Sequence, residues 1–498
     1  MTTAFHKYLI MNTLNFPILS VAIFIPLAGA ILLLFMRGER SIKVTALITA
    51  IINFPLSLFL FSRFDVGADR FQFGEFIPWV PSYNINYILG IDGITIFLIL
   101  LTTLLAPLCI LCSWTAIERR VKEFMFCLLI METAMIGVFC ALDFILFYVF
   151  WEAMLIPMYL LIAIWGGPRK DYASIKFFIY TLFGSVFLLV AIIAVYLATG
   201  TFSIPDAMFR DYGFTFQVWV FLAFAIAFAI KVPMFPFHTW LPAAHTEAPT
   251  AGSVFLASVL LKMGTYGFLR FCLPITPKAS VFFAPYMIVL SVIGIIYGGF
   301  VCLSQTDMKK LIAYSSVAHM GFATLGIFSL TLFGWEGALL QMLNHGVTTG
   351  ALFLCVGVVY ERTHSREIYD NAGLGKIMPA YVGFFGLFSI SSFAFPGTNN
   401  FVGEIYVLIG VFSRNKPAGF FSIVGALLAA AYMLRLLKQI VWGREDKRAI
   451  PDMNAREVIY LLPLALFVVW MGLFPRPFVQ VIEKTLMNLH SQMDIFFR

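Results

Sequence analysis

The sequence predicts an all-α integral membrane protein that forms a single transmembrane domain over residues 1–498. It is 61% hydrophobic and only 12% charged, whereas soluble domains contain about 25% charged residues. Its apolar residues also occur in runs of the length, about 20 residues, that a membrane-spanning helix requires. These runs are continuous and do not alternate between apolar and polar residues, which favours helices over the strands of a membrane barrel.

The chain contains about fourteen such runs, and the first is interpreted as a span because it is too long for a cleavable signal. They lie near residues 17–36, 44–62, 91–113, 124–142, 144–166, 174–198, 216–236, 250–273, 284–304, 311–330, 335–360, 379–412, 417–442 and 457–474. A short tail follows to Arg498. Aromatic and polar residues alternate in the loop at 63–90, which predicts a small hairpin on the outer face.

Lysine and arginine are distributed unevenly between the loops on the two sides. About seventeen follow the odd-numbered runs and about seven follow the even-numbered runs, leaving out the C-terminal tail. Because positive loops remain in the cytoplasm, both termini are predicted on the opposite, periplasmic side. The net charge of +7 is thus spread over short loops, and it does not indicate nucleic-acid binding.

Two runs are predicted to be broken helices. Pro233 and Pro236 interrupt the run at 216–236 directly after Lys231. The run at 379–412 is too long for one span, and Pro396 and Gly397 interrupt it before Glu404.

The two breaks lie five runs apart, and an odd spacing reverses the direction in which a helix crosses the membrane. We therefore expect two inverted five-helix repeats, at 124–273 and 284–442, with flanking helices in 1–123 and 443–498. Broken helices in corresponding positions of two repeats mark the substrate site of many transporters.

Ionisable residues inside the apolar runs are the candidate functional residues, because a buried lysine or acid costs about 2.5–3.5 kcal/mol on insertion. The strongest candidates are Glu152, Lys231, Lys262, His319, His345 and Glu404. Three others are weaker: Glu132 could pair with a positive loop residue, and His238 and His245 lie on the short segment after the first break. His319 could also be a core histidine with satisfied hydrogen bonds.

These residue types indicate proton transfer. A carboxylate favours the charged form of a nearby lysine, so movement of Glu152 away from Lys231 would release a proton toward Lys262. Histidine relays protons well because its ordinary pKa is near 6.5. The sequence shows no activated nucleophile, phosphate-binding loop or closed set of metal ligands. The seven cysteines lie in or beside apolar runs and are interpreted as packing residues, including Cys109 and Cys112.

Four stretches carry a close resemblance to a known family. They are KVPMFPFHTWLPAAHTEAPTAGSVFLASVLLKMGTYGFLRF, DMKKLIAYSSVAHMGF, QMLNHGVTTGALFLCVGVVYERTHSREI and FPGTNNFVGE. The chain resembles the antiporter-like M-type chains of bacterial proton-translocating NADH:quinone oxidoreductase, whose mitochondrial counterpart is chain 4 of respiratory complex I. That family has fourteen transmembrane helices with two inverted five-helix repeats.

The resemblance implies roles for individual residues. Glu152 and Lys231 correspond to the family's glutamate–lysine pair, Lys262 to its central lysine, and Glu404 to its exit-side residue. His319 and His345 correspond to histidines on the central hydrophilic axis. Glutamate at position 404 is typical of the M-type chain, whereas the other two antiporter-like chains usually have lysine. Ala243 departs from the family, which commonly has aspartate there.

The resemblance also implies that this chain binds no cofactor. NADH, FMN, iron–sulfur clusters and quinone are expected in partner subunits, which include two other antiporter-like chains, in the bacterial inner membrane. One alternative is a chain of a multi-subunit sodium/proton antiporter without a redox partner. Another is a redox protein with haem ligands or a quinone site at His238, His245, His319 and His345.

Overall fold

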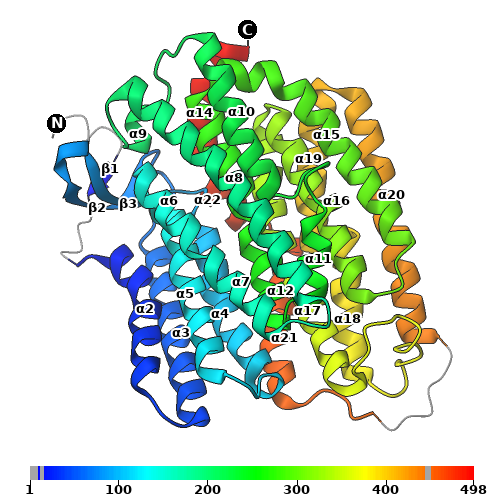
Figure 1. Cartoon of the computed structure of the whole chain (residues 1–498). Coiled ribbons are helices and arrows are strands. Elements are labelled where there is room, and N and C mark those ends of the chain that lie inside the picture. The colour runs from blue at the N-terminus through cyan, green and yellow to red at the C-terminus, as the bar shows by residue number, and fades with distance from the viewer. Residues whose placement is uncertain (1–8, 12–15, 444–449, 498) are drawn as a thin grey trace.

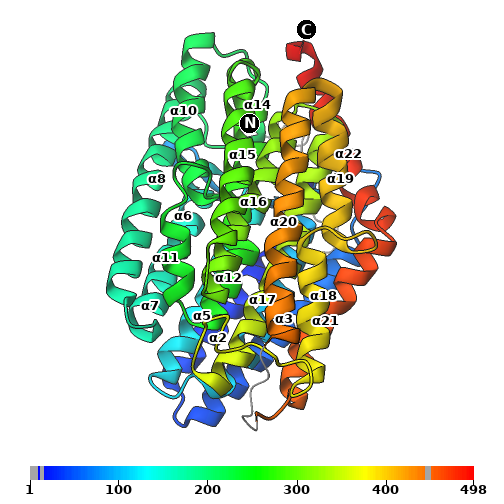
Figure 2. The same ribbon diagram turned by 90° about the vertical axis from the view of Figure 1, so that its right-hand side faces the viewer.

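The computed structural model describes residues 9–11, 16–443 and 450–497, and the predicted all-α membrane architecture is confirmed. Thirteen helices in these ranges are long and apolar enough to cross a membrane. The remaining predicted run, 379–412, forms two shorter helices with a break between them. Figures 1 and 2 show the long helices packed side by side in one bundle.

The helices fall into three stretches of the chain. The first contains α2 (Ile18–Phe35), α3 (Glu39–Ser62), α4 (Ile96–Ala116), α5 (Val121–Cys140), α6 (Phe144–Ala153), α7 (Leu155–Trp165), α8 (Lys170–Thr199), α9 (Ile204–Ala207) and α10 (Phe214–Lys231). The second contains α11 (Trp240–Glu247), α12 (Thr250–Phe255), η2 (Leu256–Leu260), α13 (Leu261–Gly267), η3 (Phe268–Cys272) and α14 (Leu273–Ile275). The third contains α15 (Pro277–Leu303), α16 (Met308–Phe328), α17 (Leu332–Thr363), α18 (Pro379–Ser392), α19 (Asn399–Arg414), α20 (Lys416–Trp442), α21 (Ala455–Leu473) and α22 (Arg476–Phe497).

The centre of the bundle is formed by the helix from α12 to α14 together with α16 and α17. The most apolar stretch of the α12–α14 helix is 100% buried, and the corresponding stretches of α16 and α17 are 94% buried. In α3, at the edge of the bundle, only 28% of that stretch is buried. The central helices therefore face other helices on all sides, and their polar side chains lie inside protein instead of lipid.

A small sheet lies at one end of the bundle, as predicted for the loop at 63–90. Strand β2 (Phe71–Val80) pairs antiparallel with β3 (Ile85–Ile91) across the short helix η1 (Pro81–Tyr83), and β1 (Leu9–Met11) adds parallel to β2. We call this end the hairpin side. The opposite end, which carries the loops at 166–169, 304–307 and 364–378, is called the basic-loop side; Figure 1 shows the hairpin at the upper left.

The predicted short tail is a 22-residue helix, α22, which returns along the hairpin side. Thr485 accepts a hydrogen bond from the Gly93 backbone (3.1 Å), and Asn488 donates one to the Asp69 carbonyl (3.1 Å). Helix α22 contains no long apolar run, because it is amphipathic, with charged residues along one face.

The predicted single span at 144–166 is interrupted at Met154, where α6 ends and α7 begins. Pro157 explains the interruption, because proline cannot donate the helical hydrogen bond to the residue four positions earlier and its ring clashes with that carbonyl. The interruption lies directly after Glu152.

Helix α17 packs closely against α19 at Gly337. A β-carbon there would collide with the backbone nitrogen of Val407 and the backbone of Tyr406. We expect that Gly337→Leu lowers the stability of the protein by about 1–3 kcal/mol, because overpacked interfaces must separate. Gly383→Leu is the matched control, since nothing lies within 4 Å of a β-carbon at that position. Thermal inactivation of the two variants measures the difference, and equal inactivation temperatures would contradict the prediction.

Candidate functional site

The first broken helix places Lys231 in the interior of the bundle. Helix α10 ends at this residue, and α11 begins at Trp240. The indole nitrogen of Trp240 donates to the Ile230 carbonyl (2.9 Å), and the Met234 backbone donates to the Ala229 carbonyl (2.8 Å). These bonds satisfy carbonyls that the end of the helix leaves free. Lys231 is only 3% exposed, and the partial negative charge of the helix C-terminus favours its ammonium group.

Lys231 lies beside the end of α6. Its ammonium nitrogen is 4.9 Å from the centre of the Trp151 ring, and the Glu152 carboxylate is close enough to act on it electrostatically. One carboxylate oxygen of Glu152, Oε1, is buried without a hydrogen-bond partner. The structure thus places the predicted glutamate and lysine in one site, each beside an interrupted helix.

The second broken helix lies between α18 and α19, as Pro396 and Gly397 predicted. Asparagine side chains hold this break. Asn344 on α17 donates to the Asn399 carbonyl (2.7 Å), and Asn400 donates to the Ser391 carbonyl (3.0 Å). Irregular backbone at membrane depth is stable only when protein groups satisfy it in this way.

Lys262 lies at the centre of the bundle, between two π-helical turns, η2 and η3. Its ammonium group donates to the Ala257 carbonyl and lies 2.6 Å from Nδ1 of His345. Wide turns of this kind occur often at functional sites. Gly346 lets α17 approach closely, because a β-carbon there would meet Leu101 and the Ser258 carbonyl. The wide turn and the glycine together bring the lysine and the histidine into contact.

From His345 the titratable groups continue toward α19. The centres of the His345 and His319 rings lie 6.0 Å apart. Nδ1 of His319 lies 3.2 Å from the Glu404 carboxylate. Gln341 donates to the same carboxylate (3.4 Å). Four of the predicted residues therefore form one row, which we call the central row: Lys262, His345, His319 and Glu404. His319 is buried and hydrogen-bonded, as a core histidine would be, and it also lies in this row.

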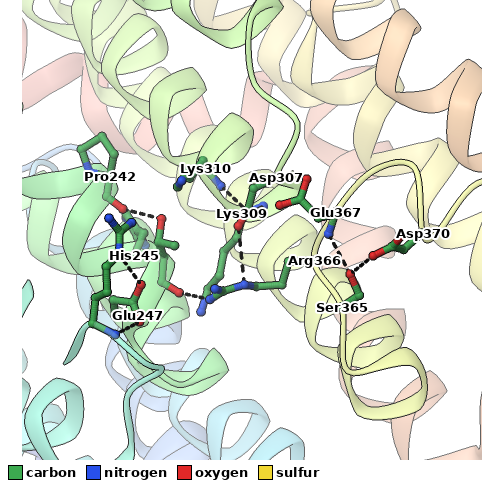
Figure 3. A network of polar contacts seen from close by, with 12 residues as sticks. Pro242, His245, Glu247, Asp307, Lys309, Lys310, Ser365, Arg366, Glu367 and Asp370 are labelled. Carbon is green, nitrogen blue, oxygen red and sulfur yellow. Dashed lines mark hydrogen bonds and ion pairs between the residues drawn. The ribbon is translucent and has the colours of Figure 1, made fainter.

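A polar cluster on the basic-loop side was not recognised in the sequence as a site. Figure 3 shows Arg366 extending toward the end of α11, where it donates to the Thr246 carbonyl and pairs with Asp307 (3.5 Å). The buried Lys309 donates to the Ala248 carbonyl beside a cavity of about 150 Å³. Lys309 lies in the first turn of α16 and Arg366 in the loop after α17, and the sequence assigns charges at such positions to loops.

The two weaker histidine candidates, His238 and His245, form no hydrogen bond with a member of the central row. Both ring nitrogens of His245 are buried without hydrogen-bond partners, and its ring stacks on Phe353 at 4.5 Å. His238 is also buried, packs against Tyr297 (5.0 Å between ring centres), and leaves Nδ1 unpartnered. His245 interacts electrostatically with both Lys262 and Lys309, so it lies between the centre of the bundle and the basic-loop cluster.

Within the part of the chain that the structure describes, Glu132 pairs with no positive loop residue, and that expectation is wrong. Its Oε1 accepts a hydrogen bond from Asn53 on α3 (2.8 Å), and its Oε2 is buried without a partner. The neutral amide of Asn53 reduces the cost of burying the carboxyl group without supplying a countercharge.

Within residues 9–11, 16–443 and 450–497, no three His, Cys, Asp or Glu side chains are placed to hold a metal ion. All seven cysteines are buried with free thiols.

Comparison with known proteins identifies the family. The family described as "NADH:quinone oxidoreductase/Mrp antiporter, TM" matches residues 141–429. The chain is 45% identical to NADH-quinone oxidoreductase subunit M of Rhodobacter capsulatus, covering 95% of this chain and 96% of that protein. It is 43% identical to NADH-ubiquinone oxidoreductase chain 4 of Marchantia polymorpha, covering 96% and 98%.

Among solved structures, a chain of respiratory complex I from Thermus thermophilus with bound NADH superposes with a TM-score of 0.87 at 30% identity, covering 96% of this chain and 98% of that chain. The Mrp complex of Dietzia sp. DQ12-45-1b has the same fold, with a TM-score of 0.81, but only 20% identity, over 96% of this chain and 55% of that chain. This chain therefore belongs to the NADH:quinone oxidoreductase/Mrp antiporter family of membrane proteins.

Proposed function

We propose that this chain relays protons across the membrane as a membrane-arm subunit of proton-translocating NADH:quinone oxidoreductase. The central row of Lys262, His345, His319 and Glu404 is the observation that carries the proposal. Every member of this row can accept and release a proton, and all four are almost fully buried. The relatives that match nearly the whole chain at 43–45% identity are subunits M and chains 4 of this enzyme.

Proton uptake begins in this mechanism at Lys231. When Glu152 lies close, its negative charge stabilises the charged lysine; when Glu152 moves away, Lys231 loses its proton toward Lys262. The interrupted helices beside both residues allow such a movement, because a break removes hydrogen bonds that hold a helix rigid.

Proton release occurs at the other end of the central row. Lys262 passes its proton to His345 at 2.6 Å, and the proton then moves through His319 to Glu404. Direct transfer requires heavy atoms within about 2.6–3.2 Å or one intervening water. The Lys262–His345 and His319–Glu404 contacts, at 2.6 and 3.2 Å, meet that condition directly. The step between the two histidine rings, whose centres are 6.0 Å apart, requires an intervening water in this mechanism.

The energy for this transfer comes from redox chemistry in partner subunits, which hold NADH, FMN, iron–sulfur clusters and quinone. The partners include other membrane-arm subunits, among them two antiporter-like chains. Glu404 assigns this chain to the M type, because the resemblance associates glutamate here with M-type chains and lysine with the other two.

The proposed architecture contains two inverted repeats, residues 124–273 and 284–442. In support, α10 approaches its break from the hairpin side and α18 approaches its break from the basic-loop side. The proposed location is the bacterial inner membrane, with the basic-loop side in the cytoplasm and both termini in the periplasm, because positive loops stay in the cytoplasm.

The experiment that tests this function replaces Glu152 in the intact enzyme. We expect Glu152→Ala to abolish proton transfer through this chain, on the order of a 100-fold loss, while Glu152→Asp keeps a substantial part of it because a carboxylate remains. The measurement is the pH gradient that membrane vesicles form per NADH oxidised. Full pumping by assembled Glu152→Ala enzyme would exclude the proposed uptake step.

The alternative function is a subunit of a sodium/proton antiporter, since the matched family includes both kinds of protein. The two are separated by expressing the chain in an antiporter-deficient strain and by purifying its complex. NADH-oxidising activity in the purified complex supports the proposal. Restored sodium tolerance with no such activity would establish the antiporter instead.

A further inference from the structure

A cavity of about 350 Å³, lined by both polar and apolar side chains, opens on the hairpin side and ends at a buried ion pair. Asp69 and Arg70 are exposed at its outer end, and Asn488 of α22 also lines it. At its inner end lie Asp92 and Arg270, which are only 4% and 3% exposed. The cavity therefore extends from exposed charged residues at the surface to the guanidinium group of Arg270.

Arg270 is held rigidly at this position. Its Nη2 lies 2.5 Å from Oδ2 of Asp92, and the guanidinium covers the rings of Phe71 (4.8 Å) and Tyr266 (5.5 Å). Asp92 is fixed in turn, because its Oδ1 accepts a hydrogen bond from the Ile94 backbone (3.1 Å). The Nε of Arg270 has no hydrogen-bond partner, so the pair leaves part of the guanidinium unsatisfied.

Arg270 belongs to the same helix as Lys262. Lys262, Tyr266 and Arg270 follow one another at intervals of four residues, which places them on one face of the α12–α14 helix. At 1.5 Å per residue, Arg270 lies about 12 Å from Lys262 along the axis. The arginine therefore separates the central lysine from the cavity on the hairpin side.

Arginine at this position can block a proton but cannot relay one. The guanidinium stays protonated in proteins and offers only donors, and a fixed positive charge excludes protons from narrow passages in other membrane proteins. We propose that Arg270 is an electrostatic barrier that prevents protons in the hairpin-side cavity from reaching Lys262. Asp92 lowers the cost of burying this charge.

This barrier rests on the proposed function, because it matters only if Lys262 exchanges protons. It gives the pathway a direction: Lys262 is closed toward the hairpin side along its own helix, and protons leave only through His345, His319 and Glu404. A purely structural ion pair would tie the end of η3 to the start of α4 without affecting proton permeability.

The test measures proton leak in proteoliposomes that contain the purified complex, an imposed pH gradient and no NADH. Replacing Arg270 while Asp92 stays charged changes the local charge by one unit, which across about 12 Å at an effective dielectric constant of about 20 changes a rate about tenfold. We expect Arg270→Gln to accelerate collapse of the gradient by at least about tenfold. Asp92→Asn should not accelerate it, because the positive charge remains. Arg210→Gln, at an exposed arginine on the same side, is the matched control.

A purely structural ion pair predicts a different pattern, in which Arg270→Gln and Asp92→Asn have equal effects on the proton leak. If Arg270→Gln alone fails to assemble, the double variant Arg270→Gln/Asp92→Asn leaves no unpaired buried charge. It should still leak, because the guanidinium that lies between the cavity and Lys262 is absent. An intact double variant that holds the gradient would overturn the barrier. The assay involves no turnover, so its result is independent of whether Glu152→Ala abolishes pumping, and the two proposals can fail separately.

Discussion

Lys262→Met is expected to stop proton transfer through this chain while the complex still assembles. Methionine fills nearly the same volume, and removing the buried charge eliminates its desolvation cost. The side chain can no longer receive a proton from Lys231 or pass one to His345, so transfer falls on the order of 100-fold. The measurement is the pH gradient formed per NADH oxidised by membrane vesicles, and the decrease gives the share of pumping carried by this chain.

Two controls separate a relay from a requirement for charge at this position. Lys262→Arg keeps the positive charge but cannot release a proton, so a relay predicts that it is as inactive as Lys262→Met. Lys278→Met removes a half-exposed lysine that pairs with Asp211 on the surface (3.3 Å) and should pump normally. Full pumping by Lys262→Arg would show that the charge suffices and would contradict the relay.

The sequence predicted the spans and their breaks because local physics determines both. An apolar run of about 20 residues has no stable alternative to a helix in lipid. Pro233 and Pro396 disfavour a continuous helix where they lie, because proline has no backbone N–H to donate. Lys262 was found for a similar reason, since an ionisable residue in the middle of such a run is rare and costly.

The partners of these residues could not be predicted, because they depend on packing between distant helices. The Arg270–Asp92 ion pair joins residues 178 positions apart, and nothing local to either residue indicates the other. Arg270 lies near the end of its run, where an arginine is ordinarily interpreted as a loop charge. Lys309 was missed for the same reason, although the structure buries it.

The order in which the members of the central row contact one another could not be predicted from the sequence either. His345 and His319 lie on neighbouring helices, α17 and α16, and only the close packing of α17 against η2 decides that His345 contacts Lys262. The sequence identified the members of the row by their cost of burial. The structure supplied their order, which makes the contribution of each member testable.

Glu404→Gln is expected to block the release end of that row. Glutamine retains a side-chain oxygen that can accept the hydrogen bond from His319, now 3.2 Å from Glu404, and it keeps the volume and the contact with Gln341. It cannot take up a proton, so we expect a loss of transfer on the order of 100-fold. Glu404→Asp restores a titratable carboxylate and should recover a substantial part of the pumping. Asp211→Asn, which alters an exposed acid, should have no effect.

The outcome at Glu404 separates two ways in which this carboxylate can act. If it only orients His319 through the hydrogen bond, glutamine replaces it and Glu404→Gln pumps like the unmodified enzyme. If it carries the proton, glutamine fails and aspartate succeeds, although aspartate lengthens the contact with His319. Proton uptake in a single turnover adds a further distinction: with the release step blocked, the protons already on Lys262 and His345 remain there, so uptake stops although Glu152 and Lys231 are intact. Continued uptake at the unmodified rate would place the exit elsewhere than at Glu404.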